Sequence, residues 1–467
     1  MDSKFSETSA SRFLPWIFVA FVAAYILNTL YQAYATPLRD IPGPWLAKLT
    51  RFWLFNANIQ RNFHSTNVNL HRTYGPIVRI APNEYSVDDP EAAQNSPWYL
   101  GFANPTAEQH VFTIQDVKHH AARLRQVKNL FQLGALMKFE NHVDRMMNVF
   151  LNQLETFAKQ DQSFDLAEWF NLFSFDTIGA MTFGKPFGVL EEGGDINDII
   201  SNIAMVSRYG ASLGVFHEFY PLIYRVLQLF APKKIVGIAF VEQFTTEVTE
   251  EWKQQSEKDR LIHDENQTGE DSTVIDILGS LLAKHSKSPE TFSVADARYH
   301  VIPNILAGGH TTAISFAATM HCLMKDPRVL SKLREALGDL TRDQESGHYS
   351  LKQTQDCTYL QAVIKESLRL FPAIGNPLAR MAPKGGLTIL GRYFPEGTIL
   401  GINPWVAHIN PSVFGADAQT FRPERWLESQ ENADHMEQYM LTVSSPSTPP
   451  HPLPPSPPQP LLTHPPS

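Results

Sequence analysis

The chain has 467 residues, of which 43% are hydrophobic and 19% are charged, and its formal net charge is -9. This composition is ordinary for a globular protein with a large core, and the acidic balance argues against a broad nucleic-acid-binding surface, so no nucleic acid partner is expected. The sequence contains two cysteines, Cys322 and Cys357. Two are too few for a disulfide framework and indicate a chain that faces a reducing compartment.

The first element in chain order is an apolar stretch from Phe13 to Leu27, which continues through a weakly polar segment to Ala35. With that extension it reaches the roughly 20 residues that a transmembrane helix needs, which predicts an N-terminal membrane anchor over residues 1–36. The alternative is a cleaved signal peptide, because Ala33-Tyr34-Ala35 is an A-x-A site after a short apolar region. The low cysteine count favours an uncleaved anchor with a cytosolic body.

A third possibility, a secreted helical protein, requires glycosylation of the sequon Asn266-Gln267-Thr268.

Residues 37–45 form a proline-rich hinge that separates the apolar segment from the body. Residues 76–88 alternate and contain β-branched side chains, which predicts a short hairpin.

From about residue 108 onward, helical periodicity dominates the chain. Two short β segments are expected near Gly-rich positions at 386–390 and 397–402. The predicted helices cover residues 115–133, 139–160, 166–183, 195–208, 233–257, 293–325, 327–339 and 356–371. The expected fold class is therefore mainly α with small β-sheets.

The predicted helix at 293–325 carries the sequence Ala307-Gly-Gly-His-Thr-Thr312 in its middle. Each glycine costs about 1 kcal/mol relative to alanine in a helix interior. One reason to keep them is close approach of a flat ligand or of dioxygen to the backbone, beside the Thr311 hydroxyl. The alternative is a packing helix that the glycines merely weaken. Pro303 predicts a kink just upstream.

Glu366 and Arg369 lie three residues apart on a predicted helix, so their side chains share a face. An isolated pair of this kind is usually an exposed surface pair that contributes little stability. Here the flanking residues 359–372 are largely apolar, which indicates burial, and a buried pair needs a further partner. Arg425, in the segment Phe421-Arg-Pro-Glu-Arg-Trp426, is the candidate.

Three motifs occur together in the order and with the spacing of one family: A-G-x-x-T at Ala307 to Thr311, E-x-x-R at Glu366 to Arg369, and P-E-R-W at Pro423 to Trp426. From the hinge to about Thr442 the chain resembles a cytochrome P450, a haem-thiolate monooxygenase. The stretches LHRTYGPIVRIAPNEYSVDDP and FSFDTIGAMTFGKPFG further resemble the pisatin-demethylase-like branch of fungal enzymes, which mostly serve secondary metabolism. The resemblance implies a cytochrome P450 fold, C-terminally truncated, with a catalytic domain over residues 37–442.

The resemblance also implies roles for individual residues. Glu366, Arg369 and Arg425 would form a buried structural triad that fixes the proximal side of haem b. Arg380 stands where the family binds a haem propionate, which the planar donor fork of arginine suits. Ala307 and Gly308 would lie against the cofactor.

Thr311 and His310 are the predicted catalytic residues, which would relay protons during oxygen activation. The family usually has Asp or Glu at the position of His310. An imidazole with a pKa of about 6.5 is able to relay protons as well. The alternative is a histidine that only fills a helix surface.

A second propionate contact is expected in residues 116–131 through the family's W/H-x-x-x-R pattern, whose register is ambiguous here. His119 and Arg123 have the right spacing. Alignment backwards from Phe131 selects His120 instead, with Arg125 one residue beyond the expected arginine. His120 and Arg125 are the predicted contacts, and a solvated basic helix face is the alternative.

The family's cysteine loop, whose thiolate binds the iron, is expected directly after P-E-R-W. Met440-Leu441-Thr442 begins that segment, but the following residues 443–467 contain eleven prolines and no cysteine, so no metal ligand is predicted. Val443-Ser444 is what an in-frame splice donor encodes, which suggests a retained intron or an incorrect gene model. The tail is predicted to be disordered or to form polyproline II, with an SH3 or WW ligand as the functional alternative. Cys357 is expected to be a small buried hydrophobe.

The expected function is a membrane-bound, haem-dependent monooxygenase of the endoplasmic reticulum membrane that hydroxylates a lipophilic small molecule in secondary metabolite biosynthesis. Its expected partner is a NADPH-cytochrome reductase. The alternative is a catalytically inactive truncated remnant or mis-spliced product that acts at most as a membrane-anchored binding scaffold. Pocket-lining residues are expected near 96–115 and 205–222.

Overall fold

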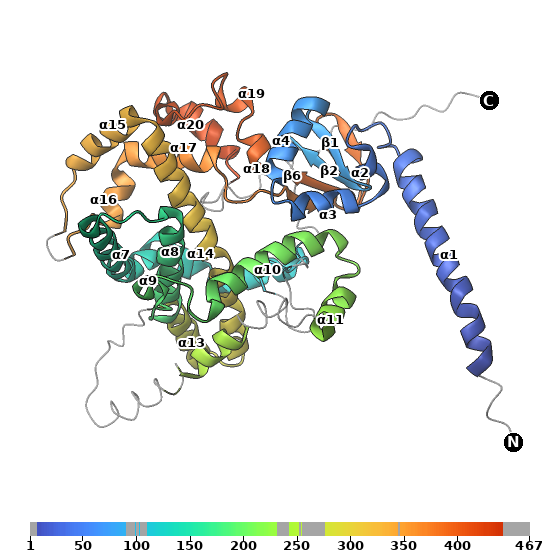
Figure 1. Cartoon of the computed structure of the whole chain (residues 1–467), viewed down its shortest axis with the longest axis horizontal. Helices are drawn as coiled ribbons and strands as arrows, with labels where there is room; N and C mark the ends of the chain where they lie inside the picture. The colour runs from blue at the N-terminus through green and yellow to red at the C-terminus, as the bar shows by residue number, and fades with distance from the viewer. Residues whose placement is uncertain are drawn as a thin grey trace.

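The computed structural model is mainly helical, as predicted, with small sheets on one side of a large helical body (Figure 1). The proline-rich tail and the sequon at Asn266 lie outside the residues that it describes, as do most of residues 96–109. The described residues are 7–89, 99, 102, 110–230, 242–251, 254, 276–343 and 346–441.

Helix α1 (Glu7–Tyr34) projects from the rest of the chain (Figure 1). Across the described residues, no helix combines the length and the apolar character that crossing a bilayer requires, so the predicted single-pass anchor in the endoplasmic reticulum membrane is wrong. In the last turns of α1, Asn28, Thr29 and Gln32 interrupt the apolar sequence with polar side chains. The end of α1 contacts the body, where Arg79 donates from Nη1 to the carbonyl of Gln32 at 3.5 Å, and Nη2 donates to the carbonyl of Leu38, after the helix, at 2.6 Å.

The first sheet joins segments from opposite ends of the chain, in the order β1-β2-β6-β3. The predicted hairpin at 76–88 is present as the antiparallel pair β1 and β2. Strand β6 pairs parallel with β2, and edge strand β3 pairs antiparallel with β6. Strands β4 and β5 form a separate hairpin. The strands are β1 (Ile77–Ala81), β2 (Glu84–Val87), β3 (Leu378–Met381), β4 (Leu387–Ile389), β5 (Arg392–Phe394) and β6 (Ile399–Ile402).

The remaining elements are helices, and two of them, α8 and α15, begin at the predicted residues 166 and 327. The α-helices are α2 (Trp45–Leu49), α3 (Phe52–Ile59), α4 (Phe63–Tyr74), α5 (Val117–Val127), α6 (Leu133–Leu136), α7 (Glu140–Gln160), α8 (Leu166–Phe183), α9 (Val189–Glu192), α10 (Ile199–Leu213), α11 (Tyr220–Phe230), α13 (Ile277–Lys287), α14 (Val294–Lys325), α15 (Pro327–Gly338), α16 (Leu351–Asp356), α17 (Thr358–Leu370), α18 (Pro404–Ala407), α19 (Pro411–Phe414) and α20 (Gln430–Gln438). The 3-10 turns are η2 (Lys128–Phe131), η3 (Met137–Phe139), η4 (Ile196–Asp198), η5 (Gly214–Phe216) and η6 (Pro423–Leu427).

Local capping explains the boundaries of the two central helices. Ser293 is the N-cap of α14 and forms a capping box. Its hydroxyl accepts from the backbone N–H of Asp296, and the Asp296 carboxylate accepts from the backbone N–H of Ser293. Asp165 caps α8 by accepting from the backbone of residues 167 and 168, and Gly184 ends it at a φ of 74°. The long helix α14 continues through Pro303. The predicted helix at 115–133 is divided, because α5 ends at Val127 and η2 follows.

The largest hydrophobic cluster surrounds α8 and α14, which pass side by side through the helical body (Figure 1). Phe175 of α8 and Ile305 of α14 are among its buried members. Consequently, the middle of α14, which carries the glycine-containing motif, is held by α8 on one side.

Candidate functional site

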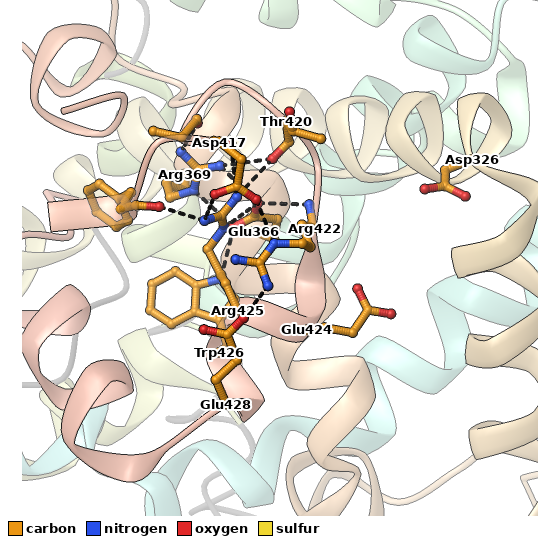
Figure 2. A network of polar contacts seen from close by, with 12 residues as sticks. Asp326, Glu366, Arg369, Asp417, Thr420, Arg422, Glu424, Arg425, Trp426 and Glu428 are labelled. Atoms are coloured by element: carbon orange, nitrogen blue, oxygen red, sulfur yellow. Dashed lines mark hydrogen bonds and ion pairs between the residues drawn. The ribbon is translucent and has the colours of Figure 1, made fainter. Parts of the chain in front are cut away.

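Glu366 is the centre of a buried polar network (Figure 2). It lies in α17 and is 0% exposed. Arg369 donates to the two carboxylate oxygens from Nη2 and Nε at 2.8 and 2.9 Å, and Arg425 donates from Nε at 2.9 Å. The structure therefore brings the three predicted triad residues together as a carboxylate between two guanidinium groups.

Two further donors complete the coordination of the Glu366 carboxylate. The backbone N–H of Arg422 lies 2.9 Å from Oε1, and the indole Nε1 of Trp426 lies 3.0 Å from Oε2. A buried charge is stable only when its hydrogen-bonding capacity is met, and here five N–H groups meet it. We refer to Glu366, Arg369, Arg425, the Arg422 backbone and the Trp426 indole as the Glu366 hub.

The remaining guanidinium donors bond the segment that lies between Arg369 and Arg422 in the sequence. Arg369 Nη1 donates to the carbonyl of His408 at 2.6 Å, and Arg425 Nη1 donates to the carbonyl of Phe414 at 2.6 Å. Arg425 also bonds Asp417 Oδ1 at 3.0 Å. The hydrogen bond from Arg422, together with that from Arg425, lowers the pKa of Asp417 to about 2, so this carboxylate stays charged. The hub therefore joins α17 to the whole chain between His408 and Trp426.

The middle of α14 presents an open apolar face. Ala307, Thr311 and Ile314 recur at the spacing of one helical face, and Ile314 is 45% exposed although the helix passes through the centre of the body. The Thr311 hydroxyl donates to the Ala307 carbonyl at 2.6 Å. Ala307 and Ile314 thus place exposed apolar side chains on either side of the Thr311 hydroxyl, and the Ser315 hydroxyl, which donates to the Thr311 carbonyl at 2.9 Å, lies one turn further.

The paired glycines of the motif face α8. A Cβ atom on Gly309 would lie 2.5 Å from the ring of Phe175, and one on Gly308 would lie 2.9 Å from Ile178. The close approach that the glycines permit is therefore an approach of α8 to α14. The packing alternative accounts for both glycines, and a haem contact of Gly308 stays a prediction.

His310 also contacts α8. Its Nδ1 atom lies 3.0 Å from Asn171 Oδ1, and its ring is roughly perpendicular to that of Phe175, with centroids 4.9 Å apart. Burial lowers the pKa of His310, so the imidazole is neutral at pH 7. His310 and Thr311 are adjacent in sequence but make contacts on different sides of the helix.

Arg380 lies on the edge strand β3 and is half-buried. Its Nη1 donates to the Tyr99 hydroxyl at 2.8 Å and to the Ala379 carbonyl at 3.0 Å. The guanidinium carbon lies 5.8 Å from the centroid of the Tyr99 ring. These contacts hold Arg380 in one orientation, with the remaining N–H groups of its donor fork suited to a carboxylate.

An ion pair on α5 bears on the two candidate pairs for a haem propionate, His119 with Arg123 and His120 with Arg125. Arg123 pairs with Asp296 in the first turn of α14, so this arginine ties the two helices together. Arg125 donates to the carbonyl of Ala121 in its own helix at 3.2 Å, and its side chain is exposed. Burial lowers the pKa of the half-buried His120. Among the described residues, no hydrogen bond or ion pair joins His120 or Arg125 to Arg380, and their predicted role stays a prediction.

The sequence model of the cytochrome P450 family matches residues 42–441. The chain belongs to the cytochrome P450 family. It is 33% identical over 428 residues to a pisatin demethylase of Fusarium vanettenii, covering 89% of this chain and 81% of the relative. It is also 30% identical over 450 residues to a cytochrome P450 monooxygenase of Aspergillus terreus, covering 92% and 88%. A cytochrome P450 monooxygenase of Emericella nidulans is 30% identical over 449 residues, covering 90% and 85%. The resemblance to this family, and to its pisatin-demethylase-like branch, is confirmed.

The cytochrome P450 family implies haem, which requires an axial thiolate. Both cysteines of the chain are described, and both are free and buried. Cys322 is 4% exposed, and burial raises the pKa of its thiol to about 11, whereas a ligand thiol needs a lowered pKa. Cys357 precedes α17 and is buried as predicted. In the parts of the chain that the structure describes, no cluster of three metal-binding side chains occurs.

The donor set thus fits the periphery of a haem and does not fit its axial bond. The open face of α14 suits a flat apolar group, and Arg380 suits a propionate. Cys322 does not suit that bond because burial raises the pKa of its thiol, and Cys357 is buried at the N-cap of α17.

Three residues of the site were not found from the sequence. His408 is fully buried, with Nδ1 3.1 Å from the Arg369 carbonyl, and its Nε2 accepts from the backbone of Leu441 at 2.8 Å. Asp417 supports Arg425, and Asn171 contacts His310. Nothing in the spacing of these residues indicates their partners, because each contact crosses between separate segments. The Trp426 indole is different, since it belongs to the P-E-R-W motif that was recognised.

Proposed function

We propose that this protein oxidises a lipophilic small molecule in the manner of the cytochrome P450 monooxygenases, using dioxygen and electrons from a NADPH-dependent reductase. The substrate is proposed to belong to secondary metabolism, as the relatedness to a pisatin demethylase and to fungal monooxygenases supports. The observation that carries the proposal is the open apolar face of α14, which lies in a chain whose Glu366 hub is fully assembled.

The chain's own residues have separate tasks in this proposal. Ala307 and Ile314 supply apolar surface for the substrate, and burial of such a substrate there removes water from it. The Thr311 hydroxyl is the proton-handling group on that face, and the Glu366 hub keeps the opposite framework rigid. The haem of the family supplies oxygen activation when it is bound through a thiolate.

A second candidate is a catalytically inactive protein that binds a lipophilic molecule without oxidising it. The burial of both cysteines favours it, and burial raises the pKa of the Cys322 thiol to about 11, which opposes a thiolate there. In this candidate the same α14 face binds the molecule, and the hub has only a structural role.

A spectroscopic experiment on the full 467-residue chain distinguishes the two candidates. Haem is added to the purified protein, and the reduced carbon monoxide complex is recorded together with haem content. A red-shifted Soret band, with turnover of a lipophilic substrate by added reductase, supports the monooxygenase. Absence of that band, with retained binding of an apolar fluorescent probe, supports the inactive binding protein.

Cysteine variants identify the source of any thiolate. Because the chain has only Cys322 and Cys357, a thiolate band must disappear in Cys322→Ala or in Cys357→Ala. A band that survives in both single variants would show that neither cysteine alone is the axial ligand. The variant Thr311→Ala leaves ligand binding intact and lowers turnover if the hydroxyl handles protons.

A further inference from the structure

A cleft of about 600 Å³ lies between α4 and the C-terminal ends of α14 and α17. Its volume is within the roughly 300 to 1,000 Å³ that ligand sites have. The part of α14 that lines it begins at His321, about three helical turns beyond Thr311, so the proposed function does not use it. We refer to it as the α4 cleft, and its walls include Val68, Arg72, Lys325, Phe371, Trp405 and Phe421.

The walls of the α4 cleft are rich in aromatic side chains. Phe371, Trp405 and Phe421 are all partly exposed there. The rings of Phe371 and Trp405 are nearly perpendicular, at 89°, with centroids 6.1 Å apart. Trp405 Nε1 donates to the carbonyl of Pro372 at 3.0 Å, which holds the indole in place. Aromatic-lined grooves of this kind bind proline-rich segments, whose polyproline II conformation is already formed and loses little entropy on binding.

The rim of the α4 cleft supplies hydrogen-bond donors. Asn69, Arg72 and Lys325 are exposed there, and Arg72 donates from Nη2 to Gln419 Oε1 at 3.3 Å with one of its five N–H groups. A proline-rich segment has carbonyl acceptors and few backbone donors, because proline has no N–H. The carboxylate in the wall, Asp326, already accepts from the backbone of α15. The donors of the rim therefore complement the acceptors of such a segment.

The chain itself contains a segment of this chemistry. Residues 442–467 lie outside the described part of the chain, and within them residues 452–460 read PLPPSPPQP, with overlapping P-x-x-P repeats. This segment has no charged side chain. Its binding would therefore depend on the aromatic walls and on the donors of the rim.

The last described residue lies beside the α4 cleft. The backbone N–H of Leu441 donates to His408 Nε2 at 2.8 Å, and His408 directly precedes Ile409, which lines the cleft. Residues 442–451 would span about 31 Å as polyproline II, so the segment at 452–460 is able to reach the walls. A short tether gives an effective concentration in the millimolar range, which favours this segment over a separate peptide of the same sequence.

We propose that the α4 cleft is the binding site of the chain's own proline-rich segment, residues 452–460. The segment packs its proline rings on Trp405 and Phe371, and its carbonyl groups accept from the rim. This interaction withholds the segment from SH3 and WW domains. It does not depend on oxidation of a substrate, so it and the proposed function are tested independently.

Photo-cross-linking of the full 467-residue chain tests the proposal. The photoreactive residue p-benzoylphenylalanine replaces Leu453, and mass spectrometry locates the cross-links after irradiation. Cross-links are expected in α4, at residues 321–326 and at residues 405–421, and they are expected in the monomer. The variant Arg72→Ala is expected to reduce their yield, because it removes a donor from the rim at an exposed position and leaves the core unchanged.

A matched control distinguishes binding from mere proximity. The chain with Pro454→Ser, Pro455→Ser, Pro457→Ser and Pro458→Ser keeps the length of the tether and the photoreactive residue but loses the polyproline II preference. Its body is unaltered, and the cross-links to the cleft are expected to be lost.

Three results would overturn the proposal. They are the absence of cross-links in the α4 cleft, an equal yield in the serine control, and cross-links found only in a covalent dimer, which would assign the segment to a second copy of the chain. Cross-links to the cleft in a protein that oxidises nothing would refute the proposed function alone. Turnover without these cross-links would refute the binding of the segment alone.

Discussion

Replacing Glu366 by alanine removes the carboxylate at the centre of the hub and leaves its donors buried. Arg369 and Arg425 are 0% and 2% exposed, so neither guanidinium is able to turn to water without local unfolding. The indole of Trp426 loses its acceptor as well. Arg425 keeps its ion pair with Asp417 at 3.0 Å, but Arg369 keeps carbonyl acceptors, which carry no charge to balance its cation.

Breaking a buried ion pair by removing one partner costs about 3 to 5 kcal/mol, because it leaves an uncompensated charge. We expect a loss in this range for Glu366→Ala, since one carboxylate here serves two guanidinium groups. Typical proteins have a free energy of unfolding of about 5 to 15 kcal/mol, so the variant is expected to be marginally folded or to accumulate poorly. Glu366→Gln keeps the shape of the side chain but removes its charge. We expect this variant to show a large part of the same decrease in the free energy of unfolding.

Urea unfolding of the purified full chain, followed by circular dichroism, measures this effect. The matched control is Glu437→Ala, which removes the carboxylate of the exposed ion pair between Lys365 of α17 and Glu437 of α20. Exposed pairs contribute about 0 to 1 kcal/mol, so the control should hardly move the midpoint. Equal midpoints for Glu366→Ala and wild type would show that the hub does not hold α17 to η6.

Three further predictions concern other parts of the chain. Gly309→Ala should lower the free energy of unfolding by about 1 to 3 kcal/mol, since its Cβ would lie 2.5 Å from Phe175. Gly338→Ala, whose Cβ meets nothing within 4 Å, should not lower it, and equal effects would refute close α8–α14 packing. Burial raises the pKa of Glu84 from 4.5 to about 7, so wild type should lose stability relative to Glu84→Gln as pH rises through this interval, and a constant difference would contradict it. Burial lowers the pKa of His408 from 6.5 to about 4, so its contribution to stability is present above pH 6.5 and is lost as pH falls towards 4. In acid-unfolding curves, His408→Gln should therefore flatten the decline of stability over this interval. A curve that is the same in wild type and variant would contradict this prediction.

Much of the helical framework could be predicted from periodicity and caps. The prediction for 166–183 matches α8 at both ends because Asp165 and Gly184 are local signals. Helix α4 was missed, since its sequence is polar and contains residues of low helix propensity such as Asn67. Asn67 is buried because it bonds Ser86 of β2 at 2.9 Å, a contact that depends on the tertiary fold. Strand β3 was missed for the same kind of reason, because pairing with β6 forms it and its own sequence does not alternate.

The residues of the candidate site likewise fall into those that local sequence spacing predicts and those that depend on the tertiary fold. Glu366, Arg369 and Arg425 could be found from spacing, because a buried pair on one helix face needs a third partner. The contact of His310 with Asn171 could not be found in this way, since it depends on how α8 packs beside α14. The prediction of an N-terminal anchor was wrong because it counted apolar residues and did not take the polar side chains at the end of α1 into account.

The strand order β1-β2-β6-β3 has a consequence for synthesis of the chain. Strand β2 ends at Val87, but its parallel partner β6 ends at Ile402, roughly 300 residues later. At about 5 to 20 residues per second, the ribosome needs about 15 to 60 seconds to deliver β6. During that interval the edge of β2 has no native partner, and such edges promote association between nascent chains. Co-translational chaperone binding to the first 90 residues would therefore be expected to improve the yield of folded protein.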